Sequence, residues 1–406
     1  MSFPIALSGL NAASADLGVT ANNIANANTH GFKTGRAEFG DVFGATAYGV
    51  SRNATGQGVR LQQITQQFTQ GNVNYTNNSL DLAINGEGFF TVASDKGMAY
   101  TRAGAFGADR NGTVVNSAGQ RLQVYPALAD GSGFNTATLQ DLQISSGDNA
   151  PRATSALSVQ ANLAATDTAP TTATFDPADP TSYNRTTSVT VYDSLGASHT
   201  ANLYFVKGAA ANAWDMNVTI DGVAAGPATP LSFDSNGILT TPALGEVTLP
   251  AVTLSNGAAP LSATLNLADT TQYGNSFSVS KLTQDGYTTG RLTGLEVTAE
   301  GVVQGRYSNG QATALGKVAV ATFANPQGLQ KLGDTAFAET YASGAALRGE
   351  AGSGSLGMMQ SGALEASNVD ITAQLVNMIT AQRNFQANAQ MIQTSDAVTQ
   401  TIINIR

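Results

Sequence analysis

The N-terminal stretch, residues 2–31, reads SFPIALSGLNAASADLGVTANNIANANTHG and decides the fold of that end of the molecule. Apolar and small side chains recur in it at alternating spacings of four and three, the pattern of one helix seam. Ser2 can cap such a helix and Pro4 fits its first turn. Asp16 is the only acidic or basic residue before the pattern ends near Gly31, so this helix is marginal alone and needs a partner. The predicted seam is Phe3, Leu7, Leu10, Ser14, Leu17, Ala21 and Ile24.

The C-terminal stretch repeats this spacing and supplies the expected partner. The pattern begins at Leu364, is interrupted at Gln382, and resumes in a shifted register at Val398, Ile402 and Ile405. We predict one long helix that pairs with the N-terminal helix as a coiled coil and brings both chain ends together. Two ordinary amphipathic core helices are the alternative interpretation. The predicted C-terminal seam is Leu364, Ile371, Leu375, Met378, Phe385, Ala389 and Ile392.

Between the two helices the period of the apolar pattern changes to two. Residues 80–84, 188–192, 201–206 and 317–323 read as strands, bounded by Asn-Gly, Asp-Gly and other glycine turns. A loop rich in Thr, Ala and Pro at residues 165–180 interrupts them, and strand-like sequence continues over 186–280. The sequence therefore predicts a mixed fold: terminal helices and two central, mainly β domains, the outer one inserted in the inner one.

The composition limits the functions that are open to this chain. It has 406 residues, enough for several domains, and only 12% of them are charged, with a net charge of −9. This acidic balance makes nucleic acid an unlikely partner. No apolar run reaches the roughly 18 residues of a membrane span, no cleaved signal peptide is recognisable, and the lack of cysteine excludes thiol chemistry.

Two terminal motifs carry a specific resemblance. Residues 21–33 read ANNIANANTHGFK, and residues 362–370 and 378–388 read GALEASNVD and MITAQRNFQAN. Asparagine and glycine at the end of the first motif should stop the helix and turn the chain. Together these stretches resemble the paired terminal signatures of the flagellar rod, hook and hook-associated axial proteins, with Phe385 where the family usually has Tyr. The motif residues are Asn22, Asn23, Asn26, Asn28, Gly31, Phe32, Ser367, Asn368 and Asp370.

The resemblance extends inward over nearly the whole chain. Residues 79–90 and 100–106 resemble the inner β domain that rod and hook proteins share. Residues 193–196, DSLG, resemble the outer domain that hook proteins have and the shorter distal rod protein lacks. The length of the chain therefore favours a hook protein, with the distal rod protein as the alternative.

This resemblance implies a structural role without catalytic residues, metal or cofactor. Residues 1–71 with 358–406 would be a terminal helical domain and extended connector lining a channel, 72–145 with 285–357 an inner β domain, and 146–284 an outer one. The chain would polymerise with itself into the hook, a curved, flexible tubular joint outside the cell that transmits torque from rod to filament. Implied partners are the distal rod protein, the hook cap, the hook–filament junction protein and the flagellar export apparatus, which exports the chain without a cleaved signal peptide.

Other chemical interpretations of the sequence are weaker. Residues 352–357 match G-x-G-x-x-G but lack a preceding hydrophobic strand, so a loop is the better interpretation. Asp109 and Asp234 begin calcium-loop-like stretches without the glutamate at the twelfth position, and hairpin turns are expected there. His30 and His199 are too isolated in the sequence to form a catalytic set. A secreted β-rich adhesin or hydrolase, with aromatic residues such as Trp214 on a binding face, remains the rival from another class.

Overall fold

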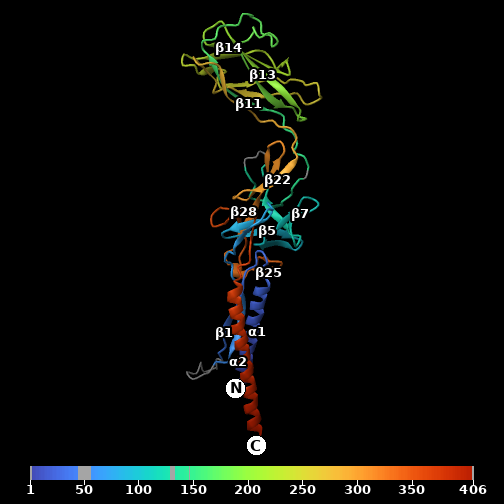
Figure 1. Cartoon of the computed structure of the whole chain (residues 1–406), viewed down its shortest axis with the longest axis vertical. Coiled ribbons are helices and arrows are strands. Elements are labelled where there is room, and N and C mark those ends of the chain that lie inside the picture. The colour runs from blue at the N-terminus through green and yellow to red at the C-terminus, as the bar shows by residue number, and fades with distance from the viewer. Residues whose placement is uncertain (1, 44–55, 129–132, 146, 405–406) are drawn as a thin grey trace. The chain divides into compact units, whose positions relative to one another are not determined.

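The chain forms two compact units, each built from more than one segment of the sequence (Figure 1). The computed structural model describes residues 2–43, 56–128, 133–145 and 147–404. The first unit contains Met1–Ser146, Gly294–Arg306 and Ala312–Arg406, and the second contains Gly147–Thr293 and Tyr307–Gln311. Terminal helices and mainly-β central domains are therefore both present, as the sequence predicts.

The only α-helices in the described part of the chain are the two terminal ones, α1 (Ser2–Ala25) and α2 (Ile371–Asn404). They lie side by side and antiparallel: Asn23 bonds to Gln374 near one end, while the space beside Gly9 is occupied by Asn388 further along. The N-terminal helix ends six residues before Gly31, because Asn26 and Thr29 form turns there instead. Neither helix is apolar enough over a sufficient length to cross a membrane.

The connector after α1 is a hairpin along that helix. Strands β1 (Gly35–Asp41) and β2 (Val59–Gln66) pair antiparallel with a bulge at Glu38 and Phe39. At the far end of the hairpin, the Ser8 hydroxyl of α1 accepts a hydrogen bond from the Val59 amide at 3.2 Å. The extended connector expected within residues 1–71 is thus partly strand, and its residues 44–55 lie outside the described residues.

The inner β region of the first unit is built mainly on one branched twelve-stranded sheet, whose main path runs β22-β23-β24-β9-β5-β6-β26-β25. Two small two-stranded sheets join the segment before α2 to residues 73–85. In them β29 (Ala363–Glu365) pairs with β3 (Val73–Tyr75), and β28 (Met358–Ser361) pairs with β4 (Leu82–Asn85). The remaining elements are β5 (Phe89–Ser94), β6 (Gly97–Thr101), β7 (Phe106–Ala108), β8 (Val114–Asn116), β9 (Arg121–Tyr125), β10 (Gln140–Asp141), β22 (Leu292–Val297), β23 (Val302–Tyr307), β24 (Ala312–Thr322), the 3-10 turn η1 (Pro326–Gly328), β25 (Gln330–Gly333), β26 (Ala336–Ala338) and β27 (Leu347–Glu350).

The second unit is all β, with two sheets that share one core. One sheet has the order β18-β19-β11-β20 with β21 also on β11, and the other has β12-β13-β14-β16-β17 with β15 on β14. Trp214, Phe205 and Leu163 are fully buried in the common core. The strands are β11 (Ala156–Ala164), β12 (Arg185–Tyr192), β13 (Ser198–Lys207), β14 (Ala213–Ile220), β15 (Val223–Ala224), β16 (Thr229–Phe233), β17 (Leu239–Thr241), β18 (Glu246–Thr248), β19 (Thr264–Asn266), β20 (Thr271–Tyr273) and β21 (Ser278–Gln284).

The two chain segments that enter and leave this unit run antiparallel beside each other. The Asn149 amide donates to the Gly290 carbonyl at 2.7 Å, and Arg152 and Tyr287 exchange two backbone hydrogen bonds of 3.0 and 2.9 Å. The inserted segment is therefore tied together at its own base.

Several local predictions are confirmed, and one is wrong. The four predicted strands correspond to β4, β12, β13 and β24, and Asp109 and Asp234 each accept backbone N–H groups within tight turns. Residues 352–357 form the turn between β27 and β28. Leu364 was predicted to open the C-terminal helix, but it lies buried in β29, because the strand pairing with β3 continues to Glu365.

Candidate functional site

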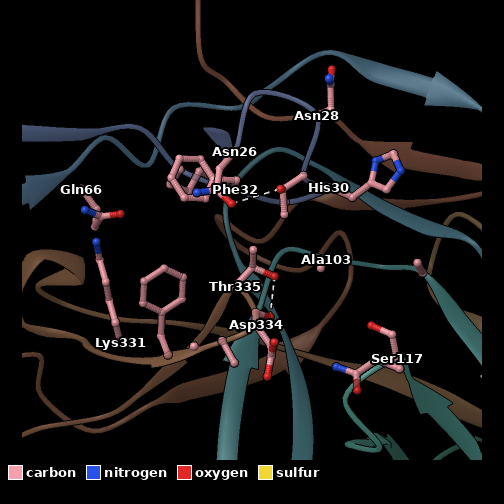
Figure 2. A pocket seen from close by; sticks show the side chains of 18 of the residues that line it. Asn26, Asn28, His30, Phe32, Gln66, Ala103, Ser117, Lys331, Asp334 and Thr335 are labelled. Atoms are coloured by element: carbon pink, nitrogen blue, oxygen red, sulfur yellow. Dashed lines mark hydrogen bonds between the residues drawn. The ribbon is translucent and has the colours of Figure 1, made fainter. Parts of the chain in front are cut away.

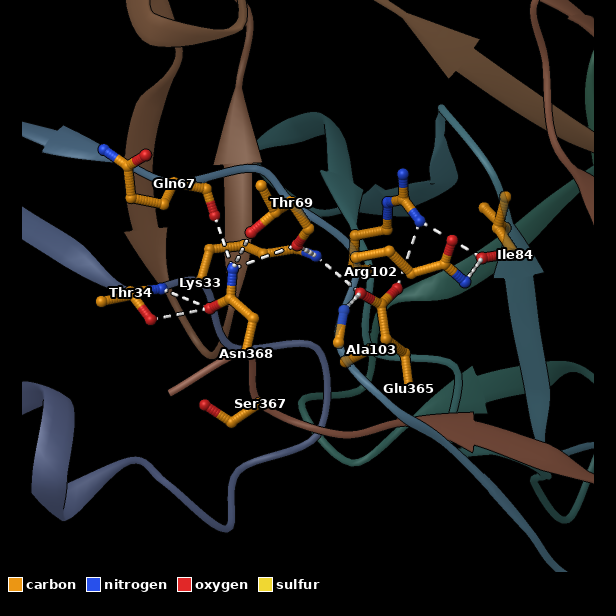
Figure 3. Close-up of polar contacts among 12 residues, drawn as sticks. Lys33, Thr34, Gln67, Thr69, Ile84, Arg102, Ala103, Glu365, Ser367 and Asn368 are labelled. Atoms are coloured by element: carbon orange, nitrogen blue, oxygen red, sulfur yellow. Dashed lines mark hydrogen bonds and ion pairs between the residues drawn. The ribbon is translucent and has the colours of Figure 1, made fainter. Parts of the chain in front are cut away.

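A buried ionic junction joins the two terminal motifs to the inner β region (Figure 3). The Glu365 carboxylate accepts hydrogen bonds from Lys33 Nζ at 2.6 Å, from the Gly71 amide at 2.9 Å and from Arg102 Nη1 at 3.1 Å. The three charged side chains are at most 5% exposed. One carboxylate therefore holds together the N-terminal motif, the connector and the inner sheet.

The electrostatics of this junction depend on Glu365. Burial lowers the pKa of Lys33 and that of Arg102, and the negative charge of Glu365 opposes both shifts. Two further donors reach backbone carbonyls: Lys33 Nζ bonds to Thr69 at 2.7 Å and Arg102 Nη2 to Gly86 at 2.7 Å, while the buried Arg102 Nε has no hydrogen-bond partner. Since an unpaired buried charge is costly, the junction is stable only as a complete set.

Gly31 allows the N-terminal motif to approach the junction. Its φ of +69° is left-handed, and a Cβ atom there would lie 2.4 Å from the Ala103 nitrogen. Its amide donates to the Glu365 carbonyl at 2.8 Å. No other residue type fits this position without moving the neighbouring backbone.

Two motif asparagines fasten the chain on either side of the junction. Asn23 exchanges two hydrogen bonds with the Gly35 backbone, of 2.8 and 2.9 Å, and bonds to Gln374 of α2 at 3.1 Å. Asn368 accepts from the amide and hydroxyl of Thr34, both at 2.8 Å, and donates to the carbonyls of Gln67 and Thr69. These asparagines thus act as cross-links between backbone segments.

The other motif residues have local roles. Asn26 donates to the Asn22 carbonyl at 2.9 Å, and Asp370 caps α2 by accepting the Ala373 amide at 3.1 Å. The Ser367 hydroxyl accepts the Val369 amide at 3.3 Å. Asn28 and Phe32 instead line a cavity.

This cavity, of about 660 Å³, lies between the loop after α1 and the β25–β26 hairpin (Figure 2). Asp334 and Thr335 at the hairpin tip both have positive φ, of 49° and 56°. Burial lowers the pKa of Lys331 on its rim. Among the described residues, no group of three or more His, Cys, Asp or Glu side chains is placed to hold a metal ion. The cavity offers polar contact surface and no recognisable catalytic set.

The helix pair is built on a different stripe from the predicted one. On α1 the buried positions are Ala6, Ala13, Thr20 and Asn23, each one residue before a predicted seam position, while Leu10, Leu17 and Ile24 are half-buried beside them. Small side chains let the two helices approach closely: a Cβ on Gly9 would lie 2.5 Å from the Asn388 side chain. Phe3 and Leu7 are therefore left outside, 49% and 42% exposed.

On α2 the middle of the predicted seam lies on the less exposed side of the helix. Met378, Phe385 and Ile392 are half-buried and Ala381 is buried, at regular three- and four-residue spacing. Ile371 and Leu375, predicted on the same seam, remain 47% and 46% exposed in the single chain. The pairing of the two helices thus leaves large apolar side chains uncovered on both.

Sequence analysis did not find the junction. Its members are up to 332 positions apart, and only the fold brings Lys33, Arg102 and Glu365 together. A usable signal existed: Lys33, Arg102 and Glu365 each lie among small, polar or apolar neighbours in a motif stretch that contains few charges.

Comparison with known proteins places the chain within one family. Family models match in four segments: "Flagella basal body rod protein" over residues 3–33, "Flagellar hook protein FlgE/F/G D1 domain" over 83–162, "Flagellar basal body protein FlaE D2 domain" over 162–287 and "Flagellar basal body rod FlgEFG protein C-terminal" over 360–405.

Relatives align over the full length. The chain is 40% identical to the flagellar hook protein FlgE of Salmonella typhimurium and 39% identical to that of Escherichia coli, with all of each chain covered. A crystal structure of the Helicobacter pylori flagellar hook protein FlgE2 shares the fold, with a TM-score of 0.54 at 15% identity over 72% of this chain and all of that one. The chain belongs to the flagellar hook protein FlgE family.

Proposed function

We propose that this chain is a structural subunit that polymerises with itself into the flagellar hook, and that the uncovered apolar faces of α1 and α2 make contacts between copies. Full-length relatives that bear the name flagellar hook protein support the role. In this role the polymer is a curved, flexible tube that transmits torque from rod to filament, and the subunit carries out no catalysis.

One observation carries the assignment of the contacts. Both terminal helices leave several large apolar side chains exposed to water, an arrangement typical of a surface that another protein covers. The charge is also low, with Asp16 alone on α1 and Arg383 and Asp396 on α2. The exposed apolar side chains are Phe3, Ile5 and Leu7 on α1 and Ile371, Leu375, Val376, Ile379, Met391, Val398 and Ile403 on α2.

The finer organisation follows as part of the same proposal. Residues 1–71 with 358–406 form the part that lines the channel, 72–145 with 285–357 the inner β domain, and 146–284 the outer one. The distal rod protein, the hook cap, the junction protein and the export apparatus are the proposed partners. The subunit acts outside the cell and is exported without a cleaved signal peptide.

Electron microscopy after concentration with a precipitating salt tests polymerisation. The full chain is expected to form tubes, and a version lacking residues 1–22 and 375–406 is not. This deletion keeps Asn23 and Glu365, so the junction and the β domains stay intact. Monodisperse monomers from both proteins would contradict the proposal.

A single substitution tests the contact face itself. Leu7→Asp places a charge on the uncovered face of α1 and should abolish tube formation, because assembly would bury that charge. Asn11→Asp adds the same charge at an exposed polar position of α1 and is the matched control, which should still polymerise. Normal tubes from Leu7→Asp would show that this face stays outside the polymer contacts.

A further inference from the structure

A histidine in the second unit is held between two carboxylates that lie in different turns. His199, near the start of β13, places Nδ1 2.6 Å from Asp221 Oδ2 and Nε2 3.2 Å from Asp193 Oδ2. Asp193 belongs to the β12–β13 turn and Asp221 to the β14–β15 turn. The His199 side chain is 11% exposed, and that of Asp193 is fully buried.

The partners of the two carboxylates fix their role as acceptors. Asp193 Oδ1 accepts the amides of Leu195 and Ala197 at 2.9 and 2.8 Å, and its Oδ2 also accepts the side-chain amide of Asn256. Asp221 Oδ1 accepts the Thr200 amide at 2.8 Å. These hydrogen bonds help to lower the pKa of both carboxyl groups, so both are ionised at neutral pH and neither has a proton to offer the imidazole.

Two acceptors on opposite sides of one imidazole require two N–H groups on the ring. A neutral histidine carries only one, so its other nitrogen would turn a lone pair toward a carboxylate. The imidazolium satisfies both contacts, and its positive charge lies between two negative ones. The geometry thus selects the protonated ring.

We propose that His199 is a proton-dependent clasp: its protonated ring ties the β12–β13 turn to the β14–β15 turn, and loss of one proton releases this tie. The β12–β13 turn also holds the loop at Asn256. The loop joins the cluster through Asn256 and through the Ala259 amide, which donates to the Ser194 hydroxyl at 2.9 Å. The clasp lies wholly in the second unit, so it does not depend on what the chain assembles into.

The charged groups around the ring agree with this role. Asp193 and Asp221 are the charged side chains whose effect on His199 is resolved, while β12 contributes neutral Val191 opposite it. Burial alone would lower the pKa of His199, but the bonds and charges of Asp221 and Asp193 outweigh it and raise this pKa. Burial alone would raise the pKa of Asp193, yet its hydrogen-bond donors lower it to about 2.

The sign of the pH dependence follows from these shifts. Because the folded pKa of His199 is raised, its contribution to stability is complete below the unfolded value of about 6.5 and is lost as the pH rises through the folded value. The contribution of Asp193 is complete above its unfolded value of about 3.9 and is lost as the pH falls toward 2. His199 and Asp193 should therefore stabilise the second unit most between about pH 3.9 and about pH 6.5.

Histidine NMR on the full chain measures the proton directly. The chain has two histidines, His30 and His199, and the variant His199→Gln identifies the second signal by its loss. We expect the His199 ring to titrate with a midpoint above the ordinary histidine value of about 6.5. A midpoint at or below that ordinary value overturns the proposal, and the wild-type measurement decides even if a variant fails to fold.

Unfolding by urea tests the clasp through the single tryptophan. Trp214 is buried in the core of the second unit, so its fluorescence reports that unit. The urea concentration at the wild-type unfolding midpoint should decrease as the pH is raised from about 6 to about 9. Most of this decrease should be absent in His199→Gln. Asp221→Asn should reduce it, whereas Asp215→Asn, an exposed position on β14, should behave as wild type. An equal pH dependence in wild type and His199→Gln would refute the clasp.

Discussion

The terminal helix pair and the second unit, which is all β, differ in which of their apolar side chains they bury. In the β unit the large residues are inside: Trp214, Phe205 and Met216 are at most 1% exposed in a core shared by both sheets. In the helix pair the small residues Ala6 and Ala13 are buried, whereas large residues such as Phe3, Leu7 and Ile371 stay exposed. The β unit is therefore complete as a single chain, whereas the helices leave large apolar side chains uncovered, and we propose that further copies cover them.

The largest expected effect comes from a substitution in the core of the second unit. Phe205→Ala removes a fully buried ring and should cost about 3–5 kcal/mol of unfolding free energy in the second unit. Urea unfolding followed by Trp214 fluorescence would show the loss, while the helical circular dichroism transition stays in place. Leu195→Ala, at a position 60% exposed in the same unit, is the control and should change stability by less than about 0.5 kcal/mol. Equal shifts in both transitions would mean that the two units unfold together.

A smaller loss is expected at the junction that ties the helices to the inner sheet. Glu365→Gln leaves Lys33 and Arg102 buried without a counter-charge and should cost about 3 kcal/mol. Hydrogen exchange should accelerate at the Gly31 and Gly71 amides, which bond to Glu365, and stay unchanged in β14.

The matched control for the junction removes a carboxylate from an exposed pair. Glu296→Gln breaks the contact with Arg306 on the surface and should have an effect of under about 1 kcal/mol. Similar exchange rates in the two variants would show that the buried junction is no more important than a surface ion pair.

The smallest effect sharpens the description of the helix pair. Ala13→Leu forces a large side chain into the seam that small residues form and should cost about 1–3 kcal/mol, seen as an earlier helical transition in circular dichroism. Ala21→Leu makes the same change at an exposed position of α1 and should be nearly neutral. If Ala21→Leu were the damaging change, the originally predicted seam would be the correct one.

The sequence predicted the helices well and their contact stripe only in part. Alternating spacing located α1 and α2, and the middle of α2, at Met378 and Phe385, lies on the observed stripe. On α1 the prediction followed the large residues, but close antiparallel packing selects small ones, so the stripe moved by one position to Ala6 and Ala13. Large apolar residues in a sequence indicate side chains that tend to be buried. They do not show whether the same chain or another copy covers these side chains.

The periodicity of apolar residues could not predict contacts between residues far apart in the sequence. Leu364 continues the apolar spacing of the helix, yet pairing with β3, almost 300 residues earlier, makes it a strand residue. Likewise, the sequence showed His199 as isolated, because Asp221 reaches it only through the pairing of β13 with β14. Periodicity describes one element at a time, while partner choice is a property of the whole chain.

The paired base of the inserted β unit has a consequence for how such chains can be rebuilt. Since Asn149 lies against Gly290 and Arg152 against Tyr287, both ends of the insert are already side by side before they join the rest of the chain. Such a segment can be exchanged as a cassette, because a replacement needs only two neighbouring ends to match. This base is the natural place to splice in a foreign domain or to vary the size of the insert while leaving the helices and the inner sheet untouched.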